Sequence, residues 1–91
     1  MQNRANKSTH EDADYFLDIT AEVCPLTFVR TKLLIEKMAR GSTAEVRLQG
    51  AEPLQNVPRA VEAQGLSILE LVPEEPDAGA FSIHRLRIRK L

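Results

Sequence analysis

The sequence of 91 residues has little aromatic content and a single cysteine. It contains three phenylalanines, one tyrosine and no tryptophan, which argues against a stacking surface for single-stranded nucleic acid. One cysteine excludes an internal disulfide, and the two histidines are too far apart to suggest a metal site. No apolar run reaches membrane-spanning length, and residues 1–13 have no secretory apolar core. We therefore expect a cytoplasmic protein without a metal or a bound cofactor.

The composition is that of one globular domain. Apolar residues make up 43% and charged residues 27% of the chain, which is ordinary for a folded domain. Residues 1–13 are almost wholly polar and show no periodicity, so we expect a disordered N-terminal tail. Residues 14–91 are long enough for a single modest core, and we expect one domain there.

Charge is unevenly distributed along the chain. The formal net charge is −1, but residues 24–41 hold four basic residues and one acidic residue, a net +3. Residues 42–79 hold seven acidic and two basic residues, a net −5, and residues 80–91 hold four basic residues. The overall balance does not indicate a nucleic-acid-binding protein, whereas a local basic patch is compatible with the sequence.

Hydrophobic periodicity predicts six elements in the order βαβαββ. We expect strands over residues 15–20, 43–49, 66–72 and 81–90, since apolar residues alternate with polar ones in most of these runs. A first helix is predicted from Pro25 to residue 39 or 40, with Gly41 just past its end. A second, short helix is predicted after a polar loop over residues 50–55, with Asn56 as its N-cap, Pro58 in its first turn and Gly65 at its close.

This order indicates an α+β fold. Two strand–helix units favour parallel strand pairs, and a final hairpin adds an antiparallel strand. We expect a two-layer α/β sandwich with a mixed four-stranded sheet and two helices on one face. In the last strand the apolar parity changes between Ile83 and Leu86, which predicts a β-bulge near His84 or Arg85. Arg85, Arg87 and Arg89 would then point to solvent along a sheet edge.

The first helix carries two apolar sets. Phe28, Thr31, Leu34, Ile35 and Met38 recur at helical spacing and are predicted to form its core face. Leu26, Val29 and Leu33 lie outside this stripe and are flanked by Arg30, Lys32 and Lys37. Two interpretations are open: a core face wide enough to reach the second helix, or an apolar docking surface with a basic rim.

Cys24 stands at the start of this helix, directly before Pro25. Proline suits the first helical position, which would place Cys24 at or next to the N-cap. The positive end of the helix dipole favours an anion there, and the thiolate is the nucleophilic form of cysteine. The N–H of Thr27 would be one of the donors. The alternative is that Cys24 is a small buried hydrophobe without chemistry.

The motif and its surroundings resemble the TusA/SirA-like sulfur-carrier family. That family places Cys-Pro-x-Pro after a first strand, and here Cys24 and Pro25 match its first two positions. Gly41 matches the glycine at the end of the first helix, and Asn56, Val57 and Pro58 match an Asp-Ile-Pro-like segment. Thr27 departs from the family pattern, since it stands where the second motif proline would be.

The resemblance implies a sulfur carrier or sulfurtransferase. Cys24 would hold a persulfide, received from a cysteine desulfurase or a rhodanese-like donor and passed to a downstream acceptor protein. Leu26, Val29, Arg30, Lys32 and Lys37 would then contribute to donor docking. Destinations known in the family include tRNA thiolation, molybdenum-cofactor maturation and sulfur oxidation. Two alternatives remain. One is a regulatory or protein-interaction module with an inert Cys24. The other is an RNA-binding domain that uses the arginine row of Arg85, Arg87 and Arg89, although the scarcity of aromatic residues disfavours RNA binding.

Overall fold

The structure, a computed structural model, describes residues 13–23 and 25–91. The order of its elements is β1 (Tyr15–Asp18), α1 (Leu26–Lys37), β2 (Thr43–Leu48), α2 (Ala51–Ala63), β3 (Ser67–Pro73) and β4 (His84–Arg89). The predicted tail at residues 1–13 lies outside the described residues, except for its last position. The βαβαββ order and the mixed four-stranded sheet of the predicted α+β fold are confirmed.

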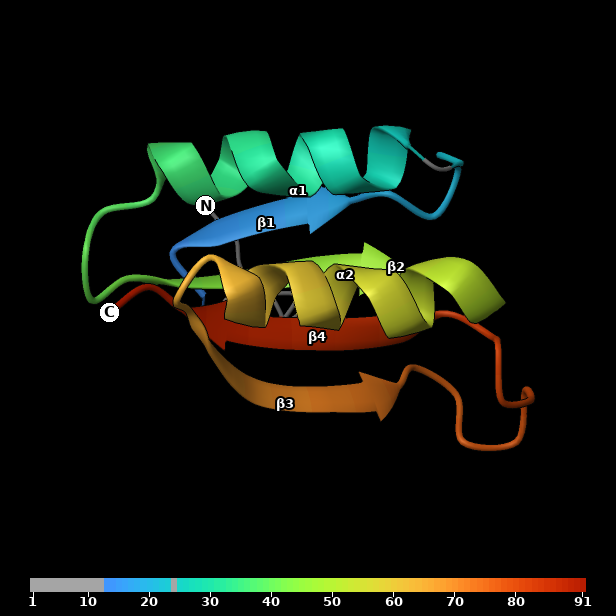
Figure 1. Cartoon of the computed structure of the whole chain (residues 1–91). Helices are drawn as coiled ribbons and strands as arrows, with labels where there is room; N and C mark the ends of the chain where they lie inside the picture. Colours follow the sequence, from blue (N-terminus) through green and yellow to red (C-terminus); the bar gives the residue numbers. More distant parts are fainter. Residues whose placement is uncertain (1–12, 24) are drawn as a thin grey trace, which may run out of the picture.

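The sheet has the strand order β1-β2-β4-β3 (Figure 1). β1 pairs with β2 in parallel, and β4 pairs antiparallel with both β2 and β3. The expected parallel pairing between strands joined by a helix therefore holds for β1 and β2, whereas β4 is inserted between β2 and β3. β4 suits this interior place because Leu86 and Ile88 are fully buried.

Both helices pack against the same face of the sheet. One apolar cluster joins Leu34 and Ile35 of α1 and Met38, the residue after its last turn, with Val57 and Val61 of α2. The sheet contributes alternate residues to this cluster, namely Ala44, Val46, Leu48, Leu86 and Ile88, all of them completely buried. Successive side chains of a strand point to opposite faces, and neither α1 nor α2 packs on the second face of the sheet.

α1 ends earlier than predicted. Its last helical residue is Lys37, and Met38 is an extended C-cap residue. Gly41 is therefore not the residue that directly follows the helix. It lies in the turn before β2, where its φ of 84° is one that a glycine adopts without strain.

The predicted loop over residues 50–55 is wrong, because α2 begins at Ala51. Gly50 is its N-cap with a φ of 102°, and its carbonyl accepts the N–H of Leu54 at 3.1 Å. Pro53 fits the first turn, where backbone N–H groups have no partner within the helix. Asn56 lies inside the helix and is not an N-cap. Pro58 also lies inside α2, because burial of Val57 and Val61 offsets the hydrogen bond that a proline removes.

The predicted bulge in the last strand is also wrong. β4 begins at His84, so Phe81 and Ile83 precede the strand and need not share its parity. The irregularity lies in β3, where the register shifts between Ile68 and Glu70. The arginine row belongs to an interior strand and not to an edge, because β4 lies between β2 and β3.

The C-terminal end of α1 is stabilised from two strands. The ammonium of Lys90 donates to the carbonyl oxygens of Ile35 and Met38, at 2.7 and 3.0 Å. The hydroxyl oxygen of Tyr15 accepts the N–H of Ala39 at 3.2 Å. The last carbonyls of a helix have no partner within the helix, and a cation beside them also opposes the negative end of the dipole.

We expect Lys90→Met to lower the free energy of unfolding by about 1–2 kcal/mol, because two partly buried carbonyls lose a charged donor. Urea denaturation at neutral pH measures this loss. Arg89→Met is the matched control, since Arg89 is the exposed neighbour of Lys90 on the chain. Equal stability of the two variants would show that the contacts of Lys90 do not stabilise α1.

Candidate functional site

The parallel pairing of β1 and β2 brings their carboxyl ends together. The register aligns Asp18 with Arg47, and the N–H of Ile19 donates to the carbonyl of Arg47 at 2.9 Å. The connection from β1 to α1, which contains Cys24, therefore leaves the sheet beside the connection from β2 to α2. The carboxyl end of a parallel strand pair is a common location for ligand and reaction sites.

Thr20, the first polar residue of this connection, is held at all its polar groups. Its N–H and its hydroxyl donate to Oδ1 of Asp18, at 2.9 and 2.7 Å. Its carbonyl accepts the side-chain N–H of Gln49, at 3.0 Å. Residues of β1 and of the end of β2 thus anchor the connection four positions before Cys24.

Cys24 itself lies outside the described residues. Its neighbours are exposed: Val23 retains 71% of its accessible surface, and Pro25 is also exposed. Pro25 is the N-cap of α1 and not its first helical residue, which is Leu26. The N–H of Leu26, the first residue of α1, donates to the carbonyl of Val23 at 2.7 Å, so Val23 lies beside the first turn of the helix.

Thr27, the second residue of α1, is almost completely buried, with 1% of its surface exposed. The core face predicted for this helix included Phe28 and not Thr27. The assignment of Phe28 to the core face is wrong, since Phe28 is 42% exposed. Thr27 and Thr31 are one turn apart, and the hydroxyl of Thr31 donates to the carbonyl of Thr27 at 2.8 Å. This bond satisfies the buried hydroxyl of Thr31 and allows a polar residue in the core face.

An exposed apolar stripe runs along α1 from the cysteine position. It consists of Val23, Leu26, Val29 and Leu33, which are between 41% and 71% exposed. The spacing of three or four residues places Leu26, Val29 and Leu33 on one side of the helix, and Val23 precedes its N-cap. These exposures exclude the interpretation in which Leu26, Val29 and Leu33 widen the core face. Contiguous exposed apolar side chains are often found at docking sites, and Leu26 and Val29 of this stripe are the apolar residues predicted for donor docking.

Basic residues flank the stripe, but they are not equivalent. Arg30 forms an ion pair with Glu22, at 2.9 Å, so its charge is compensated within the chain. Lys32 and Lys37 are exposed, and neither forms an ion pair with a described residue. The rim of the stripe is therefore positive mainly through these two lysines.

The face of the sheet opposite the helices carries an ion-pair network. The guanidinium of Arg47 bridges Asp18 and Glu74, at 3.0 and 2.9 Å, and Arg85 reaches the second oxygen of Glu74 at 2.9 Å. Farther along the same face, Arg87 contacts the buried carboxylate of Glu45 at 3.4 Å. The hydrogen bonds from Arg47 and Arg85 lower the pKa of Glu74 below its usual value, although burial opposes this. The same network raises the pKa of Arg47, chiefly through its hydrogen bonds to Glu74.

Asp18 belongs to both the network and the turn at Thr20. Burial alone would raise the pKa of Asp18, but the hydrogen bonds from Thr20 and Arg47 outweigh it and lower this pKa. The carboxylate therefore stays charged and keeps its partners at neutral pH. The side chain of Asp18 therefore contacts both Arg47 on the open face of the sheet and Thr20 in the connection between β1 and α1.

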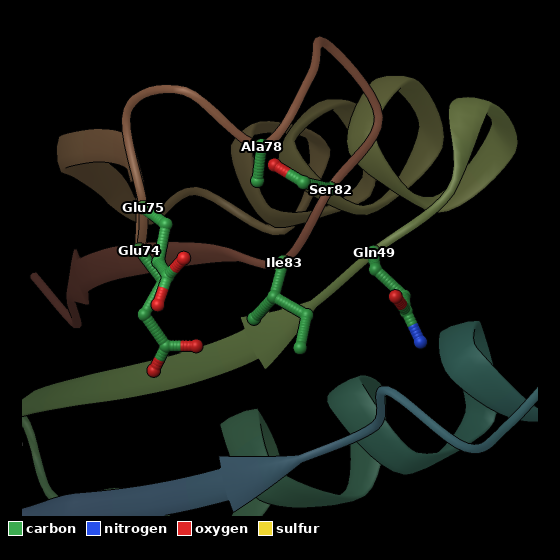
Figure 2. A pocket seen from close by; sticks show the side chains of 6 residues that line it. All are labelled: Gln49, Glu74, Glu75, Ala78, Ser82 and Ile83. Atoms are coloured by element: carbon green, nitrogen blue, oxygen red, sulfur yellow. The ribbon is translucent and has the colours of Figure 1, made fainter.

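A shallow hollow of about 260 Å³ lies at this end of the sheet. Figure 2 shows Gln49 on one side of it, Glu74 and Glu75 on the other, and Ile83 between them. The carboxylate of Glu74 is engaged by two arginines, and the hydroxyl of Ser82 donates to the carbonyl of Gly79 at 2.8 Å. The hollow thus offers no activated nucleophile of its own. In the described part of the chain, no cluster of His, Cys, Asp and Glu could hold a metal ion, and neither helix is long and apolar enough to cross a bilayer.

Comparison with known proteins identifies the family. The model of the family described as Sulfurtransferase TusA matches residues 15–90. The chain belongs to the TusA family. It is 39% identical over 71 residues to an Archaeoglobus fulgidus protein named "Putative sulfur carrier protein", an alignment that covers 78% of this chain and 80% of that protein. The crystal structure of a SirA-like protein from Desulfitobacterium hafniense has the same fold, with a TM-score of 0.67 at 21% identity, and the match covers 82% of this chain and 95% of that one. The predicted TusA/SirA-like resemblance is confirmed.

The ion-pair network makes the stability of this TusA-family domain sensitive to acid. Because the folded-state pKa of Glu74 is lowered, its stabilising contribution is complete above the unfolded-state value of about 4.5. It is lost as the pH falls through the lower folded-state value. Glu74→Gln should therefore cost about 1 kcal/mol at pH 7 and less near pH 3, which lies below the unfolded-state value of about 4.5. Urea midpoints at both pH values measure this difference.

Glu75→Gln is the matched control, since Glu75 is an exposed neighbour for which the described residues provide no ion pair. Its urea midpoint should follow that of the unmodified protein at both pH values. A loss of stability in Glu74→Gln that is the same at pH 7 and near pH 3 would show that the Glu74 charge is not what stabilises the sheet.

Proposed function

We propose that this TusA-family protein is a sulfur carrier that holds a persulfide on Cys24. The observation that carries the proposal is the coincidence of a family match over residues 15–90 with the Cys24–Pro25 motif at the start of α1. The curated relative named as a sulfur carrier supports the same activity. A carrier needs one nucleophilic sulfur that other proteins can reach, and it needs no pocket, metal or general base of its own.

The transfer step requires no external oxidant or reductant. The thiolate of Cys24 attacks the terminal sulfur of a donor persulfide, and a new S–S bond forms on Cys24. The S–S bond of the donor breaks, and the donor sulfur leaves as a thiolate that takes a proton from water. An acceptor thiolate then attacks the Cys24 persulfide in the same way, and Cys24 returns to its thiolate form. Each exchange depends on the thiolate fraction of the attacking group and on its access to the sulfur.

The surroundings of the motif suit such an exchange. The flanking residues Val23 and Pro25 are exposed, and Val23 lies beside the first turn of the helix. First-turn N–H groups and the helix dipole favour an anion at this end of α1. Thr27 stands where the family motif has a second proline, so this position of the turn has an N–H that the motif proline lacks. The anchored Thr20 limits the movement of the connection before Cys24.

The sulfur donor would dock on the exposed apolar stripe of α1. Leu26 and Val29 would provide apolar contact, and Arg30, Lys32 and Lys37 would attract an acidic rim on a cysteine desulfurase or a rhodanese-like protein. Rim charges act mainly on the association rate and are screened by salt. Because Glu22 already pairs with Arg30, Lys32 and Lys37 would contribute most of the attraction. A downstream protein then accepts the sulfur, and tRNA thiolation is one such destination in a cytoplasmic pathway.

We expect Cys24 to be the residue that takes up sulfur. After incubation with a cysteine desulfurase and cysteine, intact-mass spectrometry should show one added sulfur atom on the native chain. Cys24→Ser should show none, because serine cannot form a persulfide. Loading that persists in Cys24→Ser would contradict the proposal. A native chain that takes up no sulfur from either a cysteine desulfurase or a rhodanese-like donor would favour the protein-interaction module with an inert Cys24.

We expect Lys32→Glu to slow sulfur loading roughly threefold to tenfold at low salt, with a smaller effect at high salt, because a rim charge steers association. Arg59→Glu is the matched control, since it makes the same charge change on an exposed position of α2. Loading rates from time-resolved mass spectrometry give the comparison. Equal slowing by the two variants would show that net charge, and not the α1 surface, governs donor binding.

A further inference from the structure

β3 is an edge strand of the sheet, and no strand of the described residues pairs with its outer side. The strand order places it last, beside β4, at the opposite edge from β1 (Figure 1). Its outer residues are exposed and largely apolar: Leu69, Leu71 and Val72 keep 47%, 37% and 38% of their surface. An exposed apolar edge strand is a template for pairing with another chain. β3 has a register shift between Ile68 and Glu70 and ends at Pro73, so the part of this edge that is open to pairing is centred on Leu71.

The hydrogen-bond alternation of the sheet shows which backbone groups of β3 point outward. The N–H of Glu74, the residue after β3, donates to the carbonyl of Ile83 at 2.9 Å. The backbone groups of Glu74 are therefore directed toward the chain that leads into β4. In an antiparallel pair, every second residue exchanges its bonds with the partner strand. Val72 therefore also faces β4, whereas Leu71 and Pro73 direct their backbone groups away from it. Pro73 fits this assignment, because a proline in a strand is placed where its N side faces solvent.

A groove beside this edge can receive a side chain. It has a volume of about 410 Å³ and lies between the first turns of α2 and the end of β3, with Leu54, Leu71, Phe81 and His84 among its lining residues. Phe81 is 62% exposed and forms part of the wall. Leu71 lies opposite Leu86 of the buried face, so its side chain points to the helical side of the sheet and into this groove.

The exposed charges near the groove are mostly acidic. Residues 50–79 contain six acidic residues and one arginine, a net charge of −5, although Glu74 is paired with Arg47 and Arg85. β4 beside β3 carries Arg85, Arg87 and Arg89, of which Arg85 and Arg87 are paired with Glu74 and Glu45. Of the acidic residues, Glu52, Glu70, Glu75 and Asp77 are exposed on α2, β3 and the following turn. This region is opposite in sign to residues 24–41, which form α1 and its flanks with a net charge of +3. A partner for the β3 edge is therefore expected to be basic.

We propose that β3 binds an extended basic segment of a partner protein as a fifth, antiparallel strand. An apolar residue of that segment would lie opposite Leu71 and enter the groove, and its N–H and C=O would bond the outward groups of Leu71. The alternate residues of the segment would be basic and would face Glu70. Main-chain bonds supply affinity in this mode of recognition, and alternate side chains supply specificity.

This surface is separate from the one proposed for sulfur donors. β3 and α1 lie on opposite flanks of the molecule (Figure 1). The proposal does not depend on Cys24, so Cys24→Ser should bind the partner segment as the native chain does. A failure of the β3 proposal would consequently leave the sulfur-loading result untouched.

The probe is the fluorescein-labelled peptide KLKVKLK with blocked ends, and the measurement is fluorescence anisotropy at low salt. The native chain should bind it at least about tenfold more tightly than it binds ELEVELE, because the edge is acidic. N-methylation at the Leu and Val positions of the peptide should abolish binding, whereas N-methylation at its Lys positions should be tolerated. An equal effect of the two methylation patterns, or a reversed one, would overturn antiparallel strand addition.

Variants of the protein provide an independent check. Leu71→Pro removes both the side chain and the outward N–H, and Leu71→Ala removes the side chain alone, so the proline variant should bind the peptide more weakly. Glu70→Lys should weaken binding at least about threefold, whereas Glu36→Lys on α1 should not. Circular dichroism establishes that each variant is folded. Equal binding by the two Leu71 variants would overturn the main-chain contact.

Sedimentation velocity separates the partner segment from a second copy of the chain. We expect a monomer at the concentrations of the binding experiment, because β3-to-β3 pairing would bring two acidic edges together. A dimer that Leu71→Pro abolishes would overturn the proposal and make the second copy the occupant of the edge.

Discussion

The parallel hydrogen bonding of β1 to β2 is the constraint on which the rest of the molecule depends. It aligns Asp18 with Arg47 and brings the two strand–helix connections to the same end of the sheet. β1 has only four residues and lies at an edge, so its position is reinforced from both layers. Ile19 is buried in the core, and the carboxylate of Asp18 is bonded to Arg47 on the open face. The connection that contains Cys24 inherits its position from these contacts.

Charge separates the surface into regions that the net charge of −1 conceals. The region of α1 is basic, the region of α2 and β3 is acidic, and the open face of the sheet carries arginines that are largely compensated by Glu45 and Glu74. A sulfur carrier of the kind proposed here would have to be recognised by more than one partner. Two flanks of opposite sign allow partners of opposite charge to bind without competing for one surface.

Errors in the sequence interpretation arose where burial outweighs local propensity. Loops and helix starts are typically marked by residues such as Pro53, Asn56 and Pro58. All three nevertheless lie inside α2, because Val57 and Val61 on the same segment are packed in the core. Phe28 is more hydrophobic than Thr27, but the rotation of α1 is set by Leu34, Ile35 and Met38, and this rotation buries the threonine. The parity change before β4 resembled a bulge because the sequence does not mark the strand's first residue.

Local sequence patterns were sufficient to predict the order of the elements, the fold class and the family. Alternating apolar residues in Ala44–Val46–Leu48 and helical spacing in Leu34–Ile35–Met38 are local patterns, and the Cys24–Pro25 motif is a short contiguous signal. Only the tertiary structure decided that β4 lies between β2 and β3, that Arg30 is paired with Glu22, and that β3 is the open edge. These features depend on contacts between residues far apart in the chain. Such contacts follow from how a complete core closes over the sheet, and no single segment encodes them.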